Sequence, residues 1–221
     1  MMNMLETWEE PIREYFSSED FEKLGINVAR RRKVEKVYPE RDKIFRCFNE
    51  TPYKKTLGVI LGQDPYPQPG VADGLCFSTN ENNPTPASLM KIHKAIEKDC
   101  YDGFKLEQTN DLSYLSEQGI LMLNTSLTVA EKLPGSHAEY WSNFTKAVMN
   151  AINDIDYPIF VLALGQNAGK FASLVTNHNV FIVEHPAAAS YQGREWNNES
   201  CFRKINEFLW THYGPLNLIK W

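Results

Sequence analysis

Four short apolar runs, each ending abruptly in polar and turn-forming residues, recur along the chain. They occupy residues 57–61, 120–123, 159–164 and 180–183. The runs are rich in Val, Ile and Leu and are separated by helical patterns, which is typical of parallel strands buried on both faces of a sheet. Because ligands of such sheets bind beyond the carboxyl ends of the strands, we expect the polar residues after the four runs to share one site.

Helical periodicity predicts most of the remaining elements. The N-terminal part should be mostly helical, over residues 8–15, 20–36 and 41–48. Further helices are predicted to begin at Ser88, to cover residues 141–152, to run through Val175 after the third strand, and to cover residues 199–212.

This order of elements predicts an α/β fold, a three-layer α/β/α sandwich around a short, four-stranded, mainly parallel sheet. We expect one domain over residues 1–221, with a mostly helical part (1–55) and an α/β core (56–221). The chain of 221 residues is long enough for one buried core, and no stretch has the composition of a linker.

Composition narrows the functional classes. No apolar segment approaches the roughly 18–20 residues of a membrane span, and the start of the chain lacks the pattern of a secretion signal. We therefore expect no membrane partner and a cytoplasmic location, with the nucleus as the alternative in a eukaryotic or viral host. The four cysteines are far apart and the five histidines lack ligand spacing. We expect free thiols, no metal site and no cofactor.

The net charge of −5 argues weakly against a nucleic-acid partner. Basic residues are nevertheless concentrated between Arg30 and Lys55. This stretch fits either a solvated helix face or a surface that contacts DNA. Global charge does not exclude DNA, but it predicts binding that is sensitive to salt.

The sharpest motif is Gly62-Gln63-Asp64-Pro65-Tyr66-Pro67, directly after the first apolar run. Its two prolines, Pro65 and Pro67, stiffen the chain where it leaves a buried strand. A rigid loop of this kind fixes the Asp64 carboxylate and the Tyr66 ring, as a preorganised site requires. The alternative is an ordinary turn in which Asp64 only caps a backbone amide.

Three other residues carry candidate chemistry. His185, after the fourth run, is suited to donate a hydrogen bond to a developing anion or to act as an acid or base; alternatively, it is structural. Asn124 presents either an amide to a planar ligand edge or a cap to a turn. Phe77 stacks on a base or packs in the core.

The segment Gly165-Gln166-Asn167-Ala168-Gly169-Lys170-Phe171 differs from a nucleotide-binding phosphate loop. Only three residues separate its glycines, where the phosphate loop has four, and Phe171 stands where Ser or Thr binds magnesium. We therefore reject nucleotide hydrolysis. The backbone N–H groups of such a turn can still contact a DNA phosphate.

Together these motifs resemble the family 1 uracil-DNA glycosylases. The Gly-Gln-Asp-Pro-Tyr-His loop of that family is matched by residues 62–67, with Pro67 in the last place. Its Leu-Leu-Asn-Thr/Ala-x-Leu-Thr-Val segment is similar to residues 122–129, and its Gly-Leu-x-Phe-Ser segment to residues 74–78. Its Ser-His and Trp-x-x-Phe-Thr elements are similar to residues 136–137 and 141–145. The motifs occur in the family's order, and the resemblance extends from about residue 8 to residue 211.

The resemblance implies hydrolysis of the bond between uracil and deoxyribose, leaving an abasic site for base-excision repair, without cofactor or metal. Base flipping is part of what is implied, since glycosylases are a general example of it. The expected partner is uracil-containing DNA, and the expected state is a monomer. Protein inhibitors and replication partners are left open.

The resemblance also implies roles for individual residues. Asp64 would position the attacking water and stabilise the cationic sugar, and His185 would donate to uracil O2 as negative charge develops there. Asn124 would read the O4 and N3–H edge of uracil, which cytosine reverses.

Three further residues would complete the uracil pocket. Tyr66 would exclude the thymine methyl group by a clash. Phe77 would stack on the flipped base, and the backbone of Gln63 would help to hold O2.

The DNA-contacting loops depart most from the family. The implied DNA-binding residues are Pro86, Ala87, Ser88, Gly165, Gln166, Pro186, Ala187, Ala189 and Ser190. Ala189 stands where the family drives a leucine into the duplex, and a methyl group cannot fill the space of a flipped base. We therefore expect single-stranded uracil DNA to be favoured over duplex, unless Tyr191 or Trp196 takes the place of the leucine. On this interpretation Ala189→Leu should raise duplex activity selectively.

Two other functions compete with a repair glycosylase. One is a DNA-binding or polymerase-processivity subunit of the same fold with weak or secondary catalysis. It would not need Asp64, Asn124, His185, Tyr66 and Phe77 together. The other is a glycosylase for a different base, which the presence of Tyr66 and Asn124 disfavours.

Overall fold

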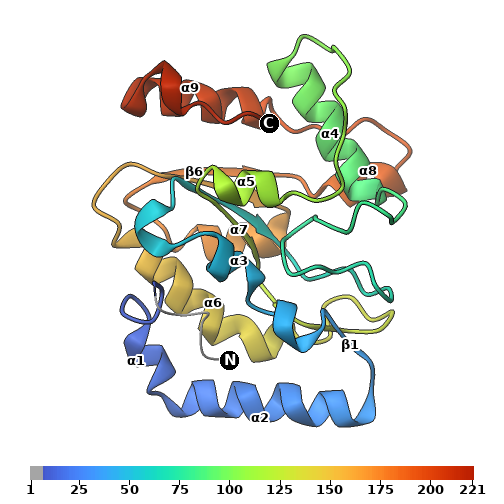
Figure 1. Ribbon diagram of the computed structural model, residues 1–221, viewed down its shortest axis with the longest axis vertical. Coiled ribbons are helices and arrows are strands. Elements are labelled where there is room, and N and C mark those ends of the chain that lie inside the picture. Colours follow the sequence, from blue (N-terminus) through green and yellow to red (C-terminus); the bar gives the residue numbers. More distant parts are fainter. Residues whose placement is uncertain (1–6) are drawn as a thin grey trace.

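The four apolar runs form one parallel sheet in the order β3-β2-β5-β6 (Figure 1). The computed structural model describes residues 7–221, apart from the side chains of Ser190 and Tyr191. The strands are β2 (Gly58–Gly62), β3 (Ile120–Asn124), β5 (Phe160–Leu164) and β6 (Asn179–Val183). Each strand is close to the predicted run, so the predicted α/β fold class is confirmed.

The register of the strands brings their carboxyl ends into one row. Gly62 lies opposite Asn124 in the β2–β3 pair, and Leu164 lies opposite Val183 in the β5–β6 pair. The loop that follows β2 therefore starts beside the end of β3. The segment after β5 likewise starts beside the segment after β6.

The prediction that all four strands are buried on both faces is wrong for β6. Ile182 in β6 is 46% exposed, whereas β2, β3 and β5 are buried throughout. β6 and β3 are the two edge strands, but β3 contacts the helices of residues 46–50 and 113–117, whereas the main helix contacts of β6 are with residues 166–172. The difference therefore comes from the helices that cover each edge, which the hydrophobic character of a run does not show.

Helices cover both faces of the sheet (Figure 1). On one side, α9 (Cys201–Tyr213) contacts β5 and also packs against α4 (Ala87–Cys100). On the other side, α7 (Gln166–Ala172) contacts β2, β5 and β6. It also packs against α6 (Ala138–Asn153), which in turn contacts α2 (Glu19–Val34). The three layers of the predicted sandwich are therefore present.

Smaller elements complete the chain. They are α1 (Arg13–Phe16), β1 (Val37–Tyr38), η1 (Arg41–Lys43), α3 (Arg46–Glu50), η2 (Tyr53–Lys55), α5 (Ser113–Glu117), β4 (Val129–Ala130), α8 (Pro186–Tyr191) and η3 (Pro215–Asn217). Of these, β1 and β4 form an antiparallel pair that the sequence analysis did not predict. Within the described chain, no helix is both long enough and apolar enough to cross a membrane.

The helix limits differ from the predictions at several places, and the helix expected over residues 41–48 is divided between η1 and α3. Residues 8–12 form turns before α1, and α2 ends at Val34, because the chain then enters β1. The helix expected to run through Val175 ends at Ala172. At the start of α2, Ser18 caps the helix by accepting a hydrogen bond from the N–H of Phe21.

Candidate active site

The loop after β2 is fixed to the segment after β3 by its backbone. The carbonyl of Gly62 accepts from the N–H of Thr125 at 3.0 Å. The carbonyl of Gln63 accepts from the N–H of Ser126 at 2.9 Å and from the Thr125 hydroxyl at 2.7 Å. The loop that carries Asp64 and Tyr66 is thus rigidly joined to the end of β3, as its prolines predict.

Asp64 is held by a residue that is distant in sequence. Its Oδ2 accepts a hydrogen bond from the backbone N–H of Gly135, in the segment between β4 and α6. Among the residues that the structure describes, Oδ1 has no hydrogen-bond donor, which leaves it available to a water molecule. Burial raises the pKa of the Asp64 carboxyl, and the Gly135 N–H partly offsets this. Asp64 therefore accepts a hydrogen bond from a backbone amide, as in the alternative of a simple turn cap, but this amide belongs to a distant segment and not to the turn of Asp64 itself.

Gly62 lies where Asn124 and Phe77 come together. A Cβ at Gly62 would be 2.5 Å from Oδ1 of Asn124 and 3.1 Å from the ring of Phe77. The glycine therefore makes the room in which these two side chains approach the β2 backbone. The structure thus brings Asn124, at the end of β3, together with Phe77, which lies in the long segment between β2 and α4.

Phe77 is held in an unusual backbone conformation, with φ of 63°. The Tyr66 hydroxyl donates to the Phe77 carbonyl at 3.0 Å. Asp73 accepts from the N–H of Leu75 and the hydroxyl of Ser78, on either side of Phe77. Several contacts therefore determine where the Phe77 ring lies, as is common at functional sites.

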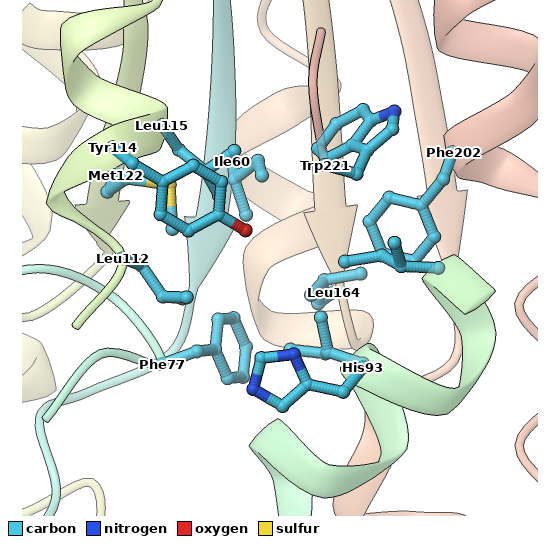
Figure 2. A pocket seen from close by; sticks show the side chains of 12 residues that line it. Ile60, Phe77, His93, Leu112, Tyr114, Leu115, Met122, Leu164, Phe202 and Trp221 are labelled. Atoms are coloured by element: carbon cyan, nitrogen blue, oxygen red, sulfur yellow. The ribbon is translucent and has the colours of Figure 1, made fainter. Parts of the chain in front are cut away.

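A small apolar cavity lies on the core side of Phe77 (Figure 2). Leu112 and Met122 line it together with His93 and the C-terminal Trp221. Its volume of about 10 Å³ leaves room for at most about one water molecule. This cavity is too small for a base, and it lies behind the ring that would contact one.

His185 faces Phe77 from the end of β6. The ring centroids are 5.7 Å apart and the planes are inclined by 42°. Nδ1 of His185 accepts from the N–H of Ala187 at 3.1 Å. Burial lowers the pKa of the imidazole. The neutral ring therefore carries its proton on Nε2, and within the described part of the chain Nε2–H has no acceptor.

Gly165 allows the close approach of His185 to the end of β5. A Cβ at this position would be 3.0 Å from Cβ of His185 and 3.3 Å from Cδ2. Its φ of 102° also favours glycine. The expected role of Gly165 in DNA binding stays a prediction, and the structure shows in addition that a side chain here would press against His185.

Comparison with known proteins agrees with this geometry. A family model described as "Uracil DNA glycosylase superfamily" matches residues 48–210, well over half of the chain. The chain belongs to the uracil-DNA glycosylase superfamily. Uracil-DNA glycosylase 1 of Listeria innocua serovar 6a is 36% identical over 211 residues, which cover 93% of each chain. The uracil-DNA glycosylase of Streptococcus thermophilus is 37% identical over 95% of each chain.

A solved structure supports the same family. The crystal structure of mimivirus uracil-DNA glycosylase superposes with a TM-score of 0.85 and is 26% identical. The match covers 95% of this chain and 84% of that chain. The resemblance stated from the sequence motifs is therefore confirmed at the level of the whole fold.

Two expected DNA contacts of this glycosylase are buried in the structure. Residues 186–191 form the short helix α8, which packs against α4. Ala189 is fully buried in it, and Pro186 is also buried, so the contact of these two residues with DNA stays a prediction. Ala187 is half-buried, and the side chain of Ser190 lies outside the described residues.

Trp196 and Tyr191 are the two residues that were considered in place of the missing leucine. Trp196 is 8% exposed, and its indole N–H donates to the carbonyl of Glu184 at 2.8 Å. It therefore cannot enter a duplex without losing this bond and its packing. The side chain of Tyr191 lies outside the described residues.

The other expected DNA contacts lie at helix starts of the glycosylase. Pro86 precedes α4, and Ala87 and Ser88 form its first turn, where Ala87 is exposed and Ser88 half-buried. Gln166 opens α7 and is exposed. Beside it, Asn167 donates its side-chain amide to Oε1 of Gln63 at 3.1 Å.

Two arginines of the basic stretch form contacts within the protein. Arg32 donates to the carbonyls of Val37 and Pro39 at 3.0 and 2.6 Å. Arg46 pairs with Asp73 at 2.9 Å, and so supports the segment that carries Phe77. The sequence analysis missed Asp73 and Gly135. A buried carboxylate and a backbone N–H give no local pattern that would reveal such a role.

Proposed function

We propose that the protein hydrolyses the N-glycosidic bond of uracil in DNA, and that this activity serves base-excision repair. One observation carries the proposal. A fixed carboxylate, Asp64, and a neutral imidazole with Nε2–H available, His185, stand at the same edge of the sheet as Asn124 and Phe77. This set supplies an anion for the sugar, a donor for the leaving base, and an amide and a ring for uracil.

Asp64 acts on the sugar and the water. Its ionised carboxylate lies where positive charge develops on the deoxyribose as the bond between C1′ and N1 breaks. The free Oδ1 orients a water molecule, whose oxygen bonds to C1′ and whose proton passes to the carboxylate. The electron pair of the broken bond leaves with uracil. The Gly135 N–H keeps the carboxylate in place throughout.

His185 acts on the leaving base. As the bond breaks, negative charge spreads to O2 of uracil, and Nε2–H donates to that oxygen. A neutral donor suffices, because the hydrogen bond strengthens as the charge develops. The backbone N–H of Gln63 is proposed as a second donor to O2.

Selectivity for uracil is assigned to the remaining pocket residues. The Asn124 amide donates to O4 and accepts from N3–H, a pattern that cytosine reverses. Tyr66 stands against C5, and its hydroxyl bond to the Phe77 carbonyl holds the ring there against a thymine methyl group. Phe77 stacks on the base.

An assay with matched oligonucleotides tests the proposal. Single-stranded and duplex DNA containing one uracil is incubated with the protein in EDTA, and abasic sites are then cleaved with alkali. We expect uracil-dependent cleavage that Asp64→Asn abolishes, and none with cytosine or thymine at the same position. DNA binding without cleavage at high protein concentration would instead favour the processivity subunit.

The oligomeric state, the absence of a metal or cofactor, and the location in the cell also stay predictions. We expect a monomer without metal or cofactor, with a cytoplasmic location that cell fractionation would test. A solved relative, the mimivirus variant Y322F, is a complex with UGI. Binding of such a protein inhibitor to this chain would be tested by inhibition of the cleavage assay.

A further inference from the structure

A turn between β4 and α6 lies against the loop that carries Asp64. We call it the 132–134 turn, after Lys132, Leu133 and Pro134. Just at its start, the N–H of Lys132 donates to the carbonyl of Pro67 at 2.9 Å. Just after its end, the N–H of Gly135 donates to Asp64 itself. The turn is therefore attached to the Asp64 loop at both ends.

The tip of this turn is open to solvent and apolar. Leu133 is 56% exposed, although it stands next to a charged, partly buried site. Its neighbour Pro134 is exposed as well. An exposed leucine needs no explanation by itself. Here, however, Leu133 belongs to the turn that is bonded to Asp64, and Asp64 is the carboxylate that must approach the sugar of a flipped nucleotide.

Lys132 adds a cation and an unusual backbone to the same turn. Its side chain is 80% exposed, and its nearest carboxylate, Glu131, lies 3.9 Å away. Glu131 also accepts from the Tyr38 hydroxyl and pairs with Lys36, so Lys132 is only partly neutralised. Its φ of 61° is uncommon for a residue with a side chain.

The attachment of the turn to the Asp64 loop brings it close to the place that a flipped nucleotide would have to reach. A base that leaves a duplex also leaves a gap, which proteins that deform DNA fill with an apolar side chain. Ala189 and Trp196 are buried and cannot do this. Leu133 is an exposed apolar side chain in a turn that Lys132 and Gly135 bond to the Asp64 loop.

We propose that the 132–134 turn is a DNA-contact element, in which Leu133 enters the gap left by the flipped nucleotide and Lys132 pairs with a neighbouring phosphate. This inference rests on the proposed uracil-DNA glycosylase function and deepens it. It predicts that duplex uracil DNA is a substrate in spite of Ala189.

The test compares single-turnover rates on single-stranded and duplex uracil DNA of the same sequence. Leu133→Ala should lower the duplex rate at least about tenfold and change the single-strand rate by less than about twofold. Leu216→Ala is the matched control, because Leu216 is 95% exposed in η3, and it should change neither rate. Both variants should unfold within a few degrees of the original protein, since surface changes are usually small.

A second measurement does not depend on catalysis. In the Asp64→Asn background, 2-aminopurine beside the uracil of a duplex reports loss of stacking through its fluorescence. Leu133→Ala should reduce the fluorescence rise on binding. Lys132→Gln should lower the slope of log affinity against log salt concentration by about 0.9, the value for one lost phosphate contact.

Two results would overturn the proposal. One is an equal loss of rate on both substrates with Leu133→Ala, which would indicate damage to the Asp64 loop. The other is an unchanged duplex rate and fluorescence with Leu133→Ala, together with a selective duplex loss with Tyr191→Ala, which would assign the wedge to α8. Failure of the glycosylase function itself would show as no cleavage of single strands by the original protein.

Discussion

The backbone N–H of Gly135 donates a hydrogen bond to Oδ2 of Asp64, although 71 positions separate the two residues in the chain. This bond joins the segment before α6 to the loop after β2. Within the described residues, the other carboxylate oxygen has no hydrogen-bond donor. The position of the proposed catalytic anion therefore depends on two segments that are far apart in the sequence.

Asp64→Asn should remove the activity and leave the fold intact. Asparagine can still accept from the Gly135 N–H, but it carries no charge for the sugar and cannot take a proton from water. We expect the single-turnover rate to fall at least about 100-fold. A rate within about threefold of the original would contradict the role of Asp64.

The same variant should be more stable than the original protein at neutral pH. Burial raises the folded-state pKa of Asp64 above its ordinary value of 3.8, so the fold disfavours the ionised form. This cost is absent below the unfolded-state pKa and grows as pH rises through the folded-state pKa. Urea unfolding at several pH values measures it. The advantage of Asp64→Asn should shrink as pH approaches 3.8, and a difference that stays constant with pH would contradict burial as the cause.

His185 should be neutral at pH 7, with its proton on Nε2. The Ala187 N–H occupies Nδ1, and burial lowers the pKa below its ordinary value of 6.5. Nitrogen-15 shifts of the ring report both the tautomer and the charge. An imidazolium at pH 7, or a proton on Nδ1, would contradict the proposed donor.

The depressed pKa of His185 also has a consequence for stability. Its contribution is fully present above about 6.5, the unfolded-state value, and is lost as pH falls through the folded-state pKa. His185→Gln should remove this part of the pH dependence. Unfolding curves of both proteins between pH 5 and 8 would show it as a smaller loss of stability in the variant.

Gly62→Ala should close the uracil pocket. The added methyl group would meet Oδ1 of Asn124 at 2.5 Å and the Phe77 ring at 3.1 Å. We expect kcat/KM to fall at least about tenfold, with a loss of stability of about 1–3 kcal/mol from overpacking. Steady-state kinetics and urea unfolding measure the two effects.

Gly25→Ala is the control for this substitution. Gly25 lies within α2, and a Cβ there meets nothing within 4 Å. Alanine should raise stability by about 0.5–1 kcal/mol and leave kcat/KM unchanged. Equal effects of the two substitutions on kcat/KM would contradict the explanation for Gly62.

Tyr66→Ala should allow release of thymine from DNA. The ring would no longer stand against C5, so a methyl group there would meet no clash. Tyr66→Phe keeps the ring and loses only the bond to the Phe77 carbonyl, at a cost of about 1 kcal/mol. We therefore expect thymine release with alanine and not with phenylalanine. Chromatography of the free bases distinguishes the two, and thymine release by both variants would contradict the steric role.

The parallel sheet could be predicted from the sequence, because each buried strand is a continuous apolar run with a polar end. The placement of Asn124 and His185 at one edge of the sheet follows from that topology, whereas Phe77 lies in a long segment whose path the topology does not predict. The exposure of Ile182 could not be predicted, since it depends on how far the helices cover each edge of the sheet. The helix α8 could have been predicted from the sequence but was not. Pro186 followed by three alanines is a typical helix N-terminus.

Other features have no signal in the sequence at all. The N–H of Gly135 is a backbone group, and only the folded chain shows that it faces Asp64. The pairing of Arg46 with Asp73 joins residues from different segments. The burial of Ala189 also alters the expected effect of Ala189→Leu, which would enlarge a side chain inside the core and not at the DNA surface.

Release of free uracil tests the central claim most directly. Duplex and single-stranded DNA with one uracil would be incubated in EDTA with the original protein and with Asp64→Asn, and the free base would be measured by mass spectrometry. We predict one uracil released per abasic site formed with the original protein, and release at least about 100-fold slower with Asp64→Asn. No free uracil from the original protein, or equal release by both proteins, would contradict it.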